Sequence, residues 1–458
     1  MTHGTLWNKL LIFALPLAAS SILQQLFNSV DTAVVGRFAS SRALAAVGSN
    51  SSLIALMINL FIGISLGSNV IISRYIGQKT EEHVKAAIHT AIVVALCSGI
   101  FVLVLGQFIA RPVLTLMGTP KDVLDLAVLY LRIYFLGMPF IMLYDFSSSI
   151  LRSIGDSRRP LYALIVAGII NTGTYNIRNN GGNCDTGYSQ MKYNDKNQVQ
   201  SGIDDSGELK KILIIGVPAG LQGMVFSLAN VCIQSMINSF GSNAIAGSAA
   251  ALNFEFFAYF MVNAFAQTTV TFTSQNYGAG DLKRCKKVYR LCMIFSVIYC
   301  GLLSGVFVLG RDFFIRLYTT DPNVLTFAVQ RLLIVTTLEL LTSTYEISGG
   351  AMRGFGHSLT PALITVVGSC VLRLIWINTV CRAVHKFWVV MIIYPISWVL
   401  TGTAKVRTFG SVVYRRRKKS RPSTKTPDNR PQNITEKIMQ RRYTFTSQNY
   451  GAGDLKRC

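Results

Sequence analysis

Long apolar stretches separated by short polar segments run through most of this chain. A helix needs about 20 mostly apolar residues to cross the hydrocarbon core of a bilayer. Suitable stretches lie near residues 8–30, 52–73, 87–110, 126–150, 210–239, 244–270, 291–310, 324–348, 360–380 and 387–404, and a shorter, borderline one lies at 160–173. We predict an all-α polytopic membrane protein with ten or eleven spans, because such helices satisfy their own backbone hydrogen bonds in lipid.

The same pattern occurs twice along the chain. KLLIFALP at Lys9–Pro16 is similar to KILIIGVP at Lys211–Pro218, at an offset of 202 residues. YDFSSSILRSIGDSRRP at Tyr144–Pro160 matches YEISGGAMRGFGHSLTP at Tyr345–Pro361, at an offset of 201. Duplicated apolar halves are typical of transporters built from two helical bundles. The repeat therefore predicts an N-terminal lobe and a C-terminal lobe, which we place at residues 1–173 and 210–404.

Two segments depart from this pattern. Residues 174–206 are polar and rich in Asn and Gly, where the repeat requires the end of a fifth span and all of a sixth. We interpret 174–209 as an aberrant linker, produced by a shifted reading frame or an insertion, with a loop that evolved in place as the alternative. Residues 405–458 are predicted to be a basic, disordered cytoplasmic tail, in which Thr444–Cys458 copies Thr271–Cys285 letter for letter.

Charge supports the membrane assignment and suggests an orientation. The net charge is +23, and the tail from residue 405 supplies +12 of it, with 15 Lys/Arg against 3 Asp/Glu. The other basic residues gather in alternate loops: Arg74, Lys79 and Lys85, then Arg152, Arg158 and Arg159, then Lys283, Arg284, Lys286, Lys287 and Arg290. By the positive-inside rule these loops and both termini face the cytoplasm. Topology thus accounts for the charge, and we expect no nucleic acid as partner.

The side on which residues 283–290 lie also tests the borderline stretch at 160–173. With ten crossings this basic loop stays on the same side as the others, whereas eleven crossings would move it outside. We therefore expect 160–173 either not to cross the membrane or to have a partner helix that does.

Ionisable and amide residues within spans are costly in lipid, so they are candidates for function. Gln24, Asn28 and Asp31 share one helix face in the first span, where a carboxylate with amide neighbours can bind Na⁺ or take up H⁺. The alternative is that Asp31 lies at the wet outer end of its helix, near Arg37.

A second polar set lies in the C-terminal lobe. It consists of two stripes at four-residue spacing, Asn230 with Gln234 and Asn238, and Glu255 with Tyr259 and Asn263. An acid, a phenol and amides facing one cavity suit a small organic cation as substrate. Hydrogen bonding between helices is the alternative, and it explains the amides equally well.

Further candidates occupy equivalent places in the repeat. Asp145 and Glu346 each precede an arginine by seven residues, Arg152 and Arg353 respectively, which is about 10 Å along a helix. A direct ion pair within each unit is therefore not expected, and we assign these residues to gating or to helix–helix contacts near the cytoplasmic ends. Glu339 shares the span of Glu346 and ranks lower, while Pro16 and Pro218 are candidate hinges early in the first helix of each half.

No enzymatic or metal-binding pattern stands out in the sequence. The nine cysteines lack ligand spacing, GxxxxGK[ST] is absent, and His89, His357 and His385 are scattered. We expect a transporter without enzymatic activity or cofactor, driven by an Na⁺ or H⁺ gradient, surrounded by membrane lipid and working as a monomer.

Several longer motifs resemble one family, the multidrug and toxic compound extrusion (MATE) transporters of bacteria. These motifs are P-x7-QQLFNSVDTAVVGRF (Pro16–Phe38), SRYIGQK (Ser73–Lys79), GVPAGLQG (Gly216–Gly223), TSQNYGAGD (Thr273–Asp281), MRGFGHSLTP (Met352–Pro361) and YPISWVLTG (Tyr394–Gly402). The resemblance implies nominally twelve helices in two lobes of six, exchanging Na⁺ or H⁺ for cationic drugs.

The resemblance also assigns individual residues. Asp31 matches the coupling acid of the family's first helix, and Asn171 matches an amide of the same cluster on the fifth helix. The next polar position of that cluster falls at Tyr175, and an acid that some members carry on the seventh helix falls at Phe226. Coupling is therefore expected at Asp31, with Gln24, Asn28 and Asn171, and Glu255 is a second candidate.

Two other functions stay open at this point. One is a flippase of lipid-linked oligosaccharides from the same superfamily, which would favour an Arg-rich cavity. The other is an inactive remnant of a transporter, which the segment 174–206 and the copied tail would explain.

Overall fold

The computed structural model describes residues 1–38, 41–116, 121–179, 205–317 and 321–419. Side-chain positions are described for all of these except residues 28–53, 55, 116, 121–123, 170–179, 205 and 416–419. Contacts gather Met1–Val412 into one compact unit and Val413–Cys458 into a second. All contacts discussed below lie within the first unit.

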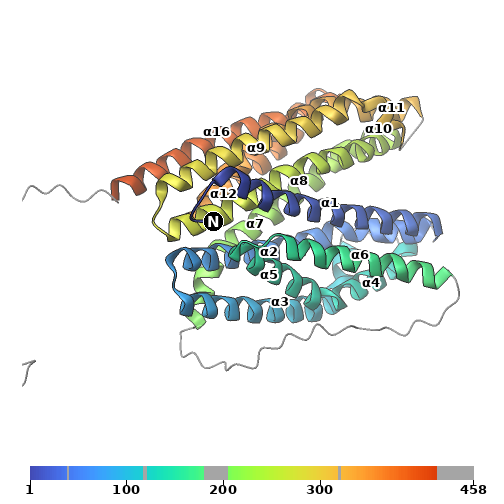
Figure 1. Cartoon of the computed structure of the whole chain (residues 1–458). Coiled ribbons are helices and arrows are strands. Elements are labelled where there is room, and N and C mark those ends of the chain that lie inside the picture. Colours follow the sequence, from blue (N-terminus) through green and yellow to red (C-terminus); the bar gives the residue numbers. More distant parts are fainter. Residues whose placement is uncertain (39–40, 117–120, 180–204, 318–320, 420–458) are drawn as a thin grey trace, which may run out of the picture. The chain divides into compact units, whose positions relative to one another are not determined.

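Helices account for every regular element in the described residues (Figure 1). The first half contains α1 (Leu6–Phe38), α2 (Ser41–Gln78), α3 (Glu81–Leu116), α4 (Lys121–Leu136), α5 (Met138–Ile154) and α6 (Arg158–Asn179). The second half contains α7 (Asp205–Asn238), α8 (Ser242–Gly278), α9 (Leu282–Leu309), α10 (Arg311–Arg316), α11 (Pro322–Arg331), the π-helix η1 (Leu332–Thr336), the 3₁₀ helix η2 (Glu339–Leu341), α12 (Thr342–Gly354), α13 (Leu359–Thr365), the π-helix η3 (Val366–Val371), α14 (Leu372–Asn378), α15 (Val380–Ala383) and α16 (Phe387–Lys419).

The described helices confirm an all-α polytopic membrane protein. Nine spans among the described residues are long and apolar enough to cross a membrane: seven single helices and two that join consecutive elements, α11–α12 and α13–α15. The bent pair α4–α5 raises this number to ten. The pair bends by 47°. Gly137 caps α5 and a proline follows within its first turn, so the helical hydrogen bonds are interrupted there. Helix α6, which contains 160–173, is not among the nine, and the number ten is the lower of the two predicted values.

The repeat offset reappears in the helix boundaries. Helices α2 and α8 begin 201 residues apart, at Ser41 and Ser242, and α6 and α13 begin at Arg158 and Leu359, again 201 apart. The counterpart of α16 in the first half would begin near residue 186 by the same offset. That position lies outside the described residues, as does most of the aberrant segment predicted at 174–206.

Two predicted boundaries are corrected. Residues 174–179 continue α6 and α7 already begins at Asp205, so less of the chain separates the halves than the predicted 174–209. The predicted tail from 405 is wrong for its first part, because α16 continues to Lys419. Lys405 and Phe409 are buried four residues apart while Arg407 is exposed, so this region keeps one helix face against the protein.

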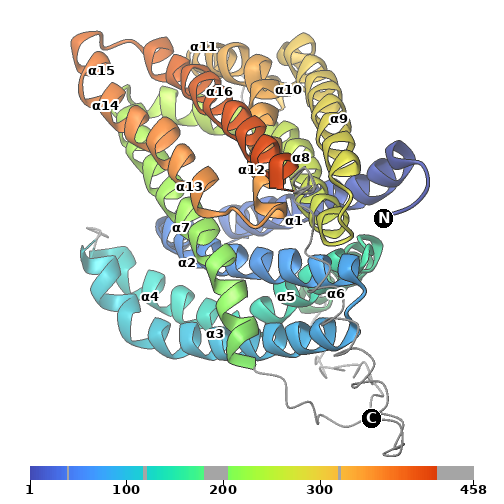
Figure 2. The ribbon, with the colours of Figure 1, turned by 90° about the vertical axis from the view of Figure 1, so that its left-hand side faces the viewer.

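Glycines allow helix α2 to cross helix α7 at very short distance. Gly63 and Gly67 on α2 face Gly216 and Gly220 on α7, each pair separated by four residues. A Cβ added at any of the four would collide with backbone atoms of the opposite helix. Close approach of this kind is how helices associate in lipid, where van der Waals packing replaces the hydrophobic effect. Figure 2 shows α7 passing α2 and continuing to α13 and α14, which it also contacts.

A second close crossing joins α2 to α8 through equivalent residues. A Cβ on Gly77 would collide with the Gln275 carbonyl, and a Cβ on Gly278 with the Arg74 carbonyl. Gly77 and Gly278 are 201 residues apart, as are Arg74 and Gln275. The contact is therefore reciprocal, which is what a local two-fold relation between the halves requires.

Hydrogen bonds at the same crossing repeat this relation. The Ser73 hydroxyl donates to the Ser153 carbonyl at 3.4 Å, and the Ser274 hydroxyl donates to the Gly354 carbonyl at 3.2 Å. Ser73 and Ser274 are again repeat partners. Both hydroxyls are buried, so these bonds also remove unsatisfied polar groups from the interface.

The basic loops predicted to share one side meet at one end of this unit. Arg284 donates hydrogen bonds to the carbonyls of Met1, His3 and Gly4, and Gln275 donates to Ser153 at the end of α5. Burial and the charges of Lys9 and Arg284 lower the pKa of the Met1 amino group. That this end faces the cytoplasm stays a prediction.

The glycine crossing can be tested with one chemical change at two sites. Gly220→Ala should destabilise the protein by about 1–3 kcal/mol, because its methyl group meets the Leu60 backbone. Gly305→Ala on α9 is the control, since nothing lies within 4 Å of its added Cβ, and it should be neutral or stabilising. Thermal unfolding of the purified protein in detergent measures both, and equal melting temperatures for the two variants would contradict the role of the crossing.

Candidate functional site

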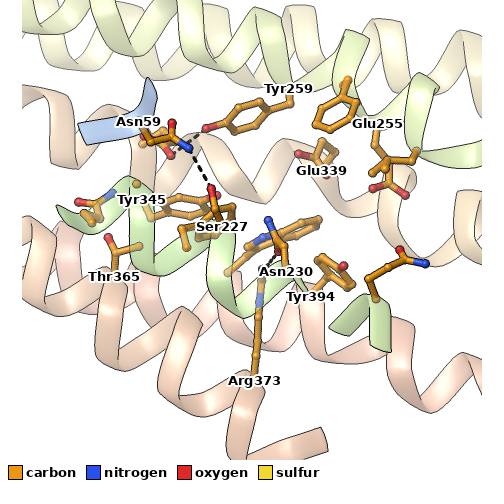
Figure 3. A pocket seen from close by; sticks show the side chains of 18 of the residues that line it. Asn59, Ser227, Asn230, Glu255, Tyr259, Glu339, Tyr345, Thr365, Arg373 and Tyr394 are labelled. Carbon is orange, nitrogen blue, oxygen red and sulfur yellow. Dashed lines mark hydrogen bonds between the residues drawn. The ribbon is translucent and has the colours of Figure 1, made fainter. Parts of the chain in front are cut away.

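A cavity of about 410 Å³ lies among the helices of the second half (Figure 3). This volume is within the range of pockets that bind drug-sized molecules. Most of its wall is formed by α7, α8, α12 and α16, and Asn59 of α2 closes one edge. The lining residues are Asn59, Gln222, Gly223, Phe226, Ser227, Asn230, Gln234, Leu252, Glu255, Phe256, Tyr259, Arg331, Glu339, Tyr345, Glu346, Thr365, Arg373, Tyr394 and Trp398.

An ion pair between α8 and α11 forms part of this wall. Arg331 donates from Nε to Glu255 Oε1 at 2.6 Å and from Nη2 to Oε2 at 2.8 Å, and its Nη1 donates to the Ser248 hydroxyl. Both charged side chains are almost completely buried. A bidentate pair of this kind is the strong form of an Arg–carboxylate contact. The negative charge of Glu255 is therefore already neutralised from within the protein.

Two further carboxylates face the cavity without such a partner. Glu339 lies in η2, where the span from α11 to α12 loses its regular α-helical hydrogen bonding, and only 4% of it is exposed. Glu346 accepts a hydrogen bond from the Tyr259 hydroxyl at 3.2 Å. Within the described part of the chain, neither carboxylate has a cationic side chain within ion-pair distance. Irregular helix segments that line a cavity are where transporters place their ligand groups.

Arg373 of α14 reaches into the cavity from the opposite side (Figure 3). Its Nε donates to the Ser397 hydroxyl at 3.1 Å and its Nη1 donates to the Asn230 side-chain carbonyl at 3.3 Å. The guanidinium carbon lies 4.6 Å from the ring centre of Tyr394 and 5.3 Å from that of Phe226. In total the lining has three carboxylates and two guanidiniums, so one negative charge is in excess.

The structure places four of the five predicted substrate residues on this wall. Glu255 and Tyr259 of α8 and Asn230 and Gln234 of α7 all line the cavity. Asn263 does not, which corrects its predicted place beside them. One further turn of α8 carries Asn263 about 6 Å along the helix, past Glu346, into a separate cavity. Contact of these residues with a substrate stays a prediction.

Sequence reasoning missed Arg331 and Arg373. Both lie inside apolar spans, at 324–348 and 360–380, so the rule that selected Glu255 could have selected them too. The acid expected by resemblance at Phe226 is replaced by an aromatic ring that lies against the guanidinium of Arg373. The charge pattern of this site therefore differs from the one that the acids alone suggested.

The second cavity has a volume of about 390 Å³ and lies between the two halves of the repeat. It brings together four repeat-related residues that were predicted as gating groups, Asp145, Arg152, Glu346 and Arg353. Arg353 donates to the Gln222 side-chain carbonyl at 2.8 Å. Glu346 lines both cavities, so it lies on the wall that separates them. A gating role for these four residues stays a prediction.

Part of the predicted cation-coupling cluster is described. Gln24 of α1 lines the second cavity. Asn28 and Asp31 lie on α1 and Asn171 lies on α6, and these two helices contact one another. The side chains of Asn28, Asp31 and Asn171 are outside the described residues. Pro16 and Pro218 lie inside α1 and α7, as expected.

Helical spans in two related sets, with charged cavities in and between them, define a polytopic membrane transporter fold. The sequence model of the MatE family matches residues 16–174 and 218–377. The chain belongs to the MatE family.

Individual relatives agree with this assignment. A protein named "Probable multidrug resistance protein YoeA" from Bacillus subtilis is 29% identical over 79% of this chain and 84% of its own length. A protein named "FAD transporter" from Shewanella oneidensis is 24% identical over 65% of this chain and 71% of its own length. A solved structure described as the outward-facing conformation of a multidrug resistance MATE family transporter has a TM-score of 0.76 and 17% identity. It covers 92% of this chain and 98% of its own, and it shows the shared fold.

The Glu255–Arg331 pair predicts a pattern of stability changes. Glu255→Gln and Arg331→Met should each destabilise the protein by about 3–5 kcal/mol, because each leaves a buried group without its partner. The double variant should lose much less than both single variants together. Thermal unfolding in detergent gives the three values, with exposed Glu82→Gln as the matched control. Additive losses would mean that the two residues stabilise the protein separately.

Proposed function

We propose that this chain exports small organic cations across the bacterial inner membrane in exchange for Na⁺ or H⁺. The observation that carries this proposal is the pair of carboxylates, Glu339 and Glu346, that face a cavity of drug-sized volume without a cationic partner among the described residues. A cation entering the cavity supplies the missing charge, and the ring of Trp398, which lines the same cavity, adds a favourable cation–π contact. The names of relatives in the MatE family, among them a multidrug resistance protein, support the same substrate class.

Coupling is assigned to the first half. Asp31 is the acid on α1, with Gln24 and Asn28 on the same helix and Asn171 on the contacting helix α6. A carboxylate with amide neighbours binds either Na⁺ or a proton. The driving ion and the substrate would then occupy different halves of the protein, and their exchange requires the halves to move relative to one another.

Movement of the halves is assigned to the second cavity and to the two prolines. Closing or opening the space lined by Asp145, Arg152, Glu346 and Arg353 would change which charged groups meet. Pro16 and Pro218 interrupt hydrogen bonding early in α1 and α7, where bending costs least. We expect the protein to alternate between two orientations of its halves, as a monomer.

A lipid-linked oligosaccharide flippase fits this cavity less well. Recognition of pyrophosphate favours several unpaired guanidiniums. Of the two arginines at the cavity, Arg331 is already paired with Glu255. The two unpaired carboxylates, Glu339 and Glu346, would repel a polyanion.

The coupling assignment predicts the behaviour of Asp31→Asn. Cells that express the chain should accumulate less ethidium than cells without it, and the variant should lose this difference because it has no titratable or ion-binding carboxylate at that site. Asp312→Asn, at an exposed position on α10, is the matched control and should keep it. Uptake fluorescence at equal expression measures all three, and export by Asp31→Asn at the normal rate would exclude this site.

The substrate assignment predicts a binding defect for Glu339→Gln. Removing one unpaired charge from the cavity should weaken ethidium binding about tenfold, which corresponds to about 1.4 kcal/mol. The measurement is ethidium fluorescence titration of the purified protein in detergent. Glu82→Gln, exposed at the start of α3, is the control. Unchanged affinity in Glu339→Gln would place the cation elsewhere.

A further inference from the structure

Arg373 is a buried cation whose hydrogen bonding is incomplete. Only 1% of the side chain is exposed, and a guanidinium keeps its charge in any protein environment. Two of its three nitrogens donate hydrogen bonds, to Ser397 and Asn230, but Nη2 has no partner in the described part of the chain. A buried donor without an acceptor is costly, and the cost is larger for a charged group.

The charge of Arg373 is also uncompensated by direct contact. Among the described residues no carboxylate lies within ion-pair distance of its guanidinium. Glu255, on the wall of the same cavity, is paired with Arg331 instead. The groups that contact it directly are neutral: the Tyr394 and Phe226 rings and the two hydrogen-bond acceptors. Glu339 acts on its charge only from beyond ion-pair distance. The aromatic faces orient the guanidinium plane beside the cavity and leave Nη2 as its remaining hydrogen-bond donor.

The fold does not require an arginine at this position. By the repeat offset of 201, Arg373 corresponds to Thr172 on α6, so the equivalent helix of the first half carries a small neutral side chain there. The repeat therefore has Thr in the sequence of one half and a buried, incompletely hydrogen-bonded Arg in the other, which suggests a role for Arg373 that belongs to the second half alone.

We propose that Arg373 is a carboxylate-binding residue in the second-half cavity, which gives the cavity a higher affinity for organic cations that also carry a carboxylate. The proposal rests on the proposed export function and narrows its substrate class. A carboxylate offers two oxygens to the guanidinium, which compensates the charge and satisfies Nη2. The cationic end of the same molecule then lies toward Glu339 across the cavity (Figure 3). Glu346 also lines the cavity and adds a second negative charge.

A carboxylate fits better than a phosphate. Only one guanidinium is unpaired, and two carboxylates share the cavity with it. A dianionic phosphate would therefore keep an uncompensated negative charge near Glu339 and Glu346, whereas a single carboxylate would not.

The test compares two dyes that differ only at this group. Rhodamine 110 has a free carboxylate, and rhodamine 123 is its methyl ester with the same cationic ring system. Fluorescence polarisation with the purified full-length protein in detergent gives the affinity for each dye. Arg373→Gln should weaken binding of rhodamine 110 at least tenfold and binding of rhodamine 123 less than twofold. Arg373→Lys should lie between, because it keeps the charge without the planar fork.

Arg316→Gln, at an exposed position on α10, is the matched control and should leave both affinities unchanged. If Arg373→Gln lowers the affinity for both dyes equally, the residue only supports the fold. If both affinities are unchanged, the residue binds neither dye. Either result overturns the proposal. If Arg373→Gln does not fold, the ratio of the two affinities in Arg373→Lys decides. Ethidium export is measured separately, so loss of the export function alone leaves the dye comparison interpretable.

Discussion

The close crossing of α2 and α7 is the contact on which the rest of the structure depends. It joins the first half of the repeat to the second through four glycines, and it can do so only because no side chain separates the two backbones. Two turns further along α7, Asn59 of α2 donates a hydrogen bond to Ser227 at 2.9 Å, on the edge of the second-half cavity. The same crossing therefore fixes the distance between the halves and one wall of the candidate site.

The charges within the spans divide into two kinds. Paired charges stabilise the packing of helices: Arg331 of α11 and Glu255 of α8 are joined by two hydrogen bonds, and both charges are buried together. Others, among them Glu339, Glu346 and Arg373, line the cavity without an oppositely charged side chain at ion-pair distance among the described residues. In a low-dielectric interior an unpaired charge costs more than a paired one, which is why we propose the unpaired groups, and not Glu255, as those that meet the substrate. This reasoning separates Glu255 from Glu339, although both are buried acids of the same cavity.

Much of the architecture could be predicted from periodicity and the internal repeat. The offset of 201 recurs in helix starts and in reciprocal contacts such as Gly77 with Gln275 and Gly278 with Arg74. The helix ends were less predictable, since α16 continues through a basic stretch that composition assigned to a tail. Asn263 was misplaced because a stripe at four-residue spacing shows which face a residue occupies, but not which cavity that face meets at each turn.

The sequence by itself determined that the chain is a helical membrane protein made of two related halves, because apolar length and duplication are local properties of the chain. It also identified most of the ionisable residues that lie in spans. Only the tertiary structure decided which of them neutralise one another. Glu255 and Arg331 are 76 residues apart, and Arg373 meets Asn230 across 143 residues. Electrostatic pairing depends on distances of a few ångströms between helices, and only the packing of α7, α8, α11 and α14 sets those distances.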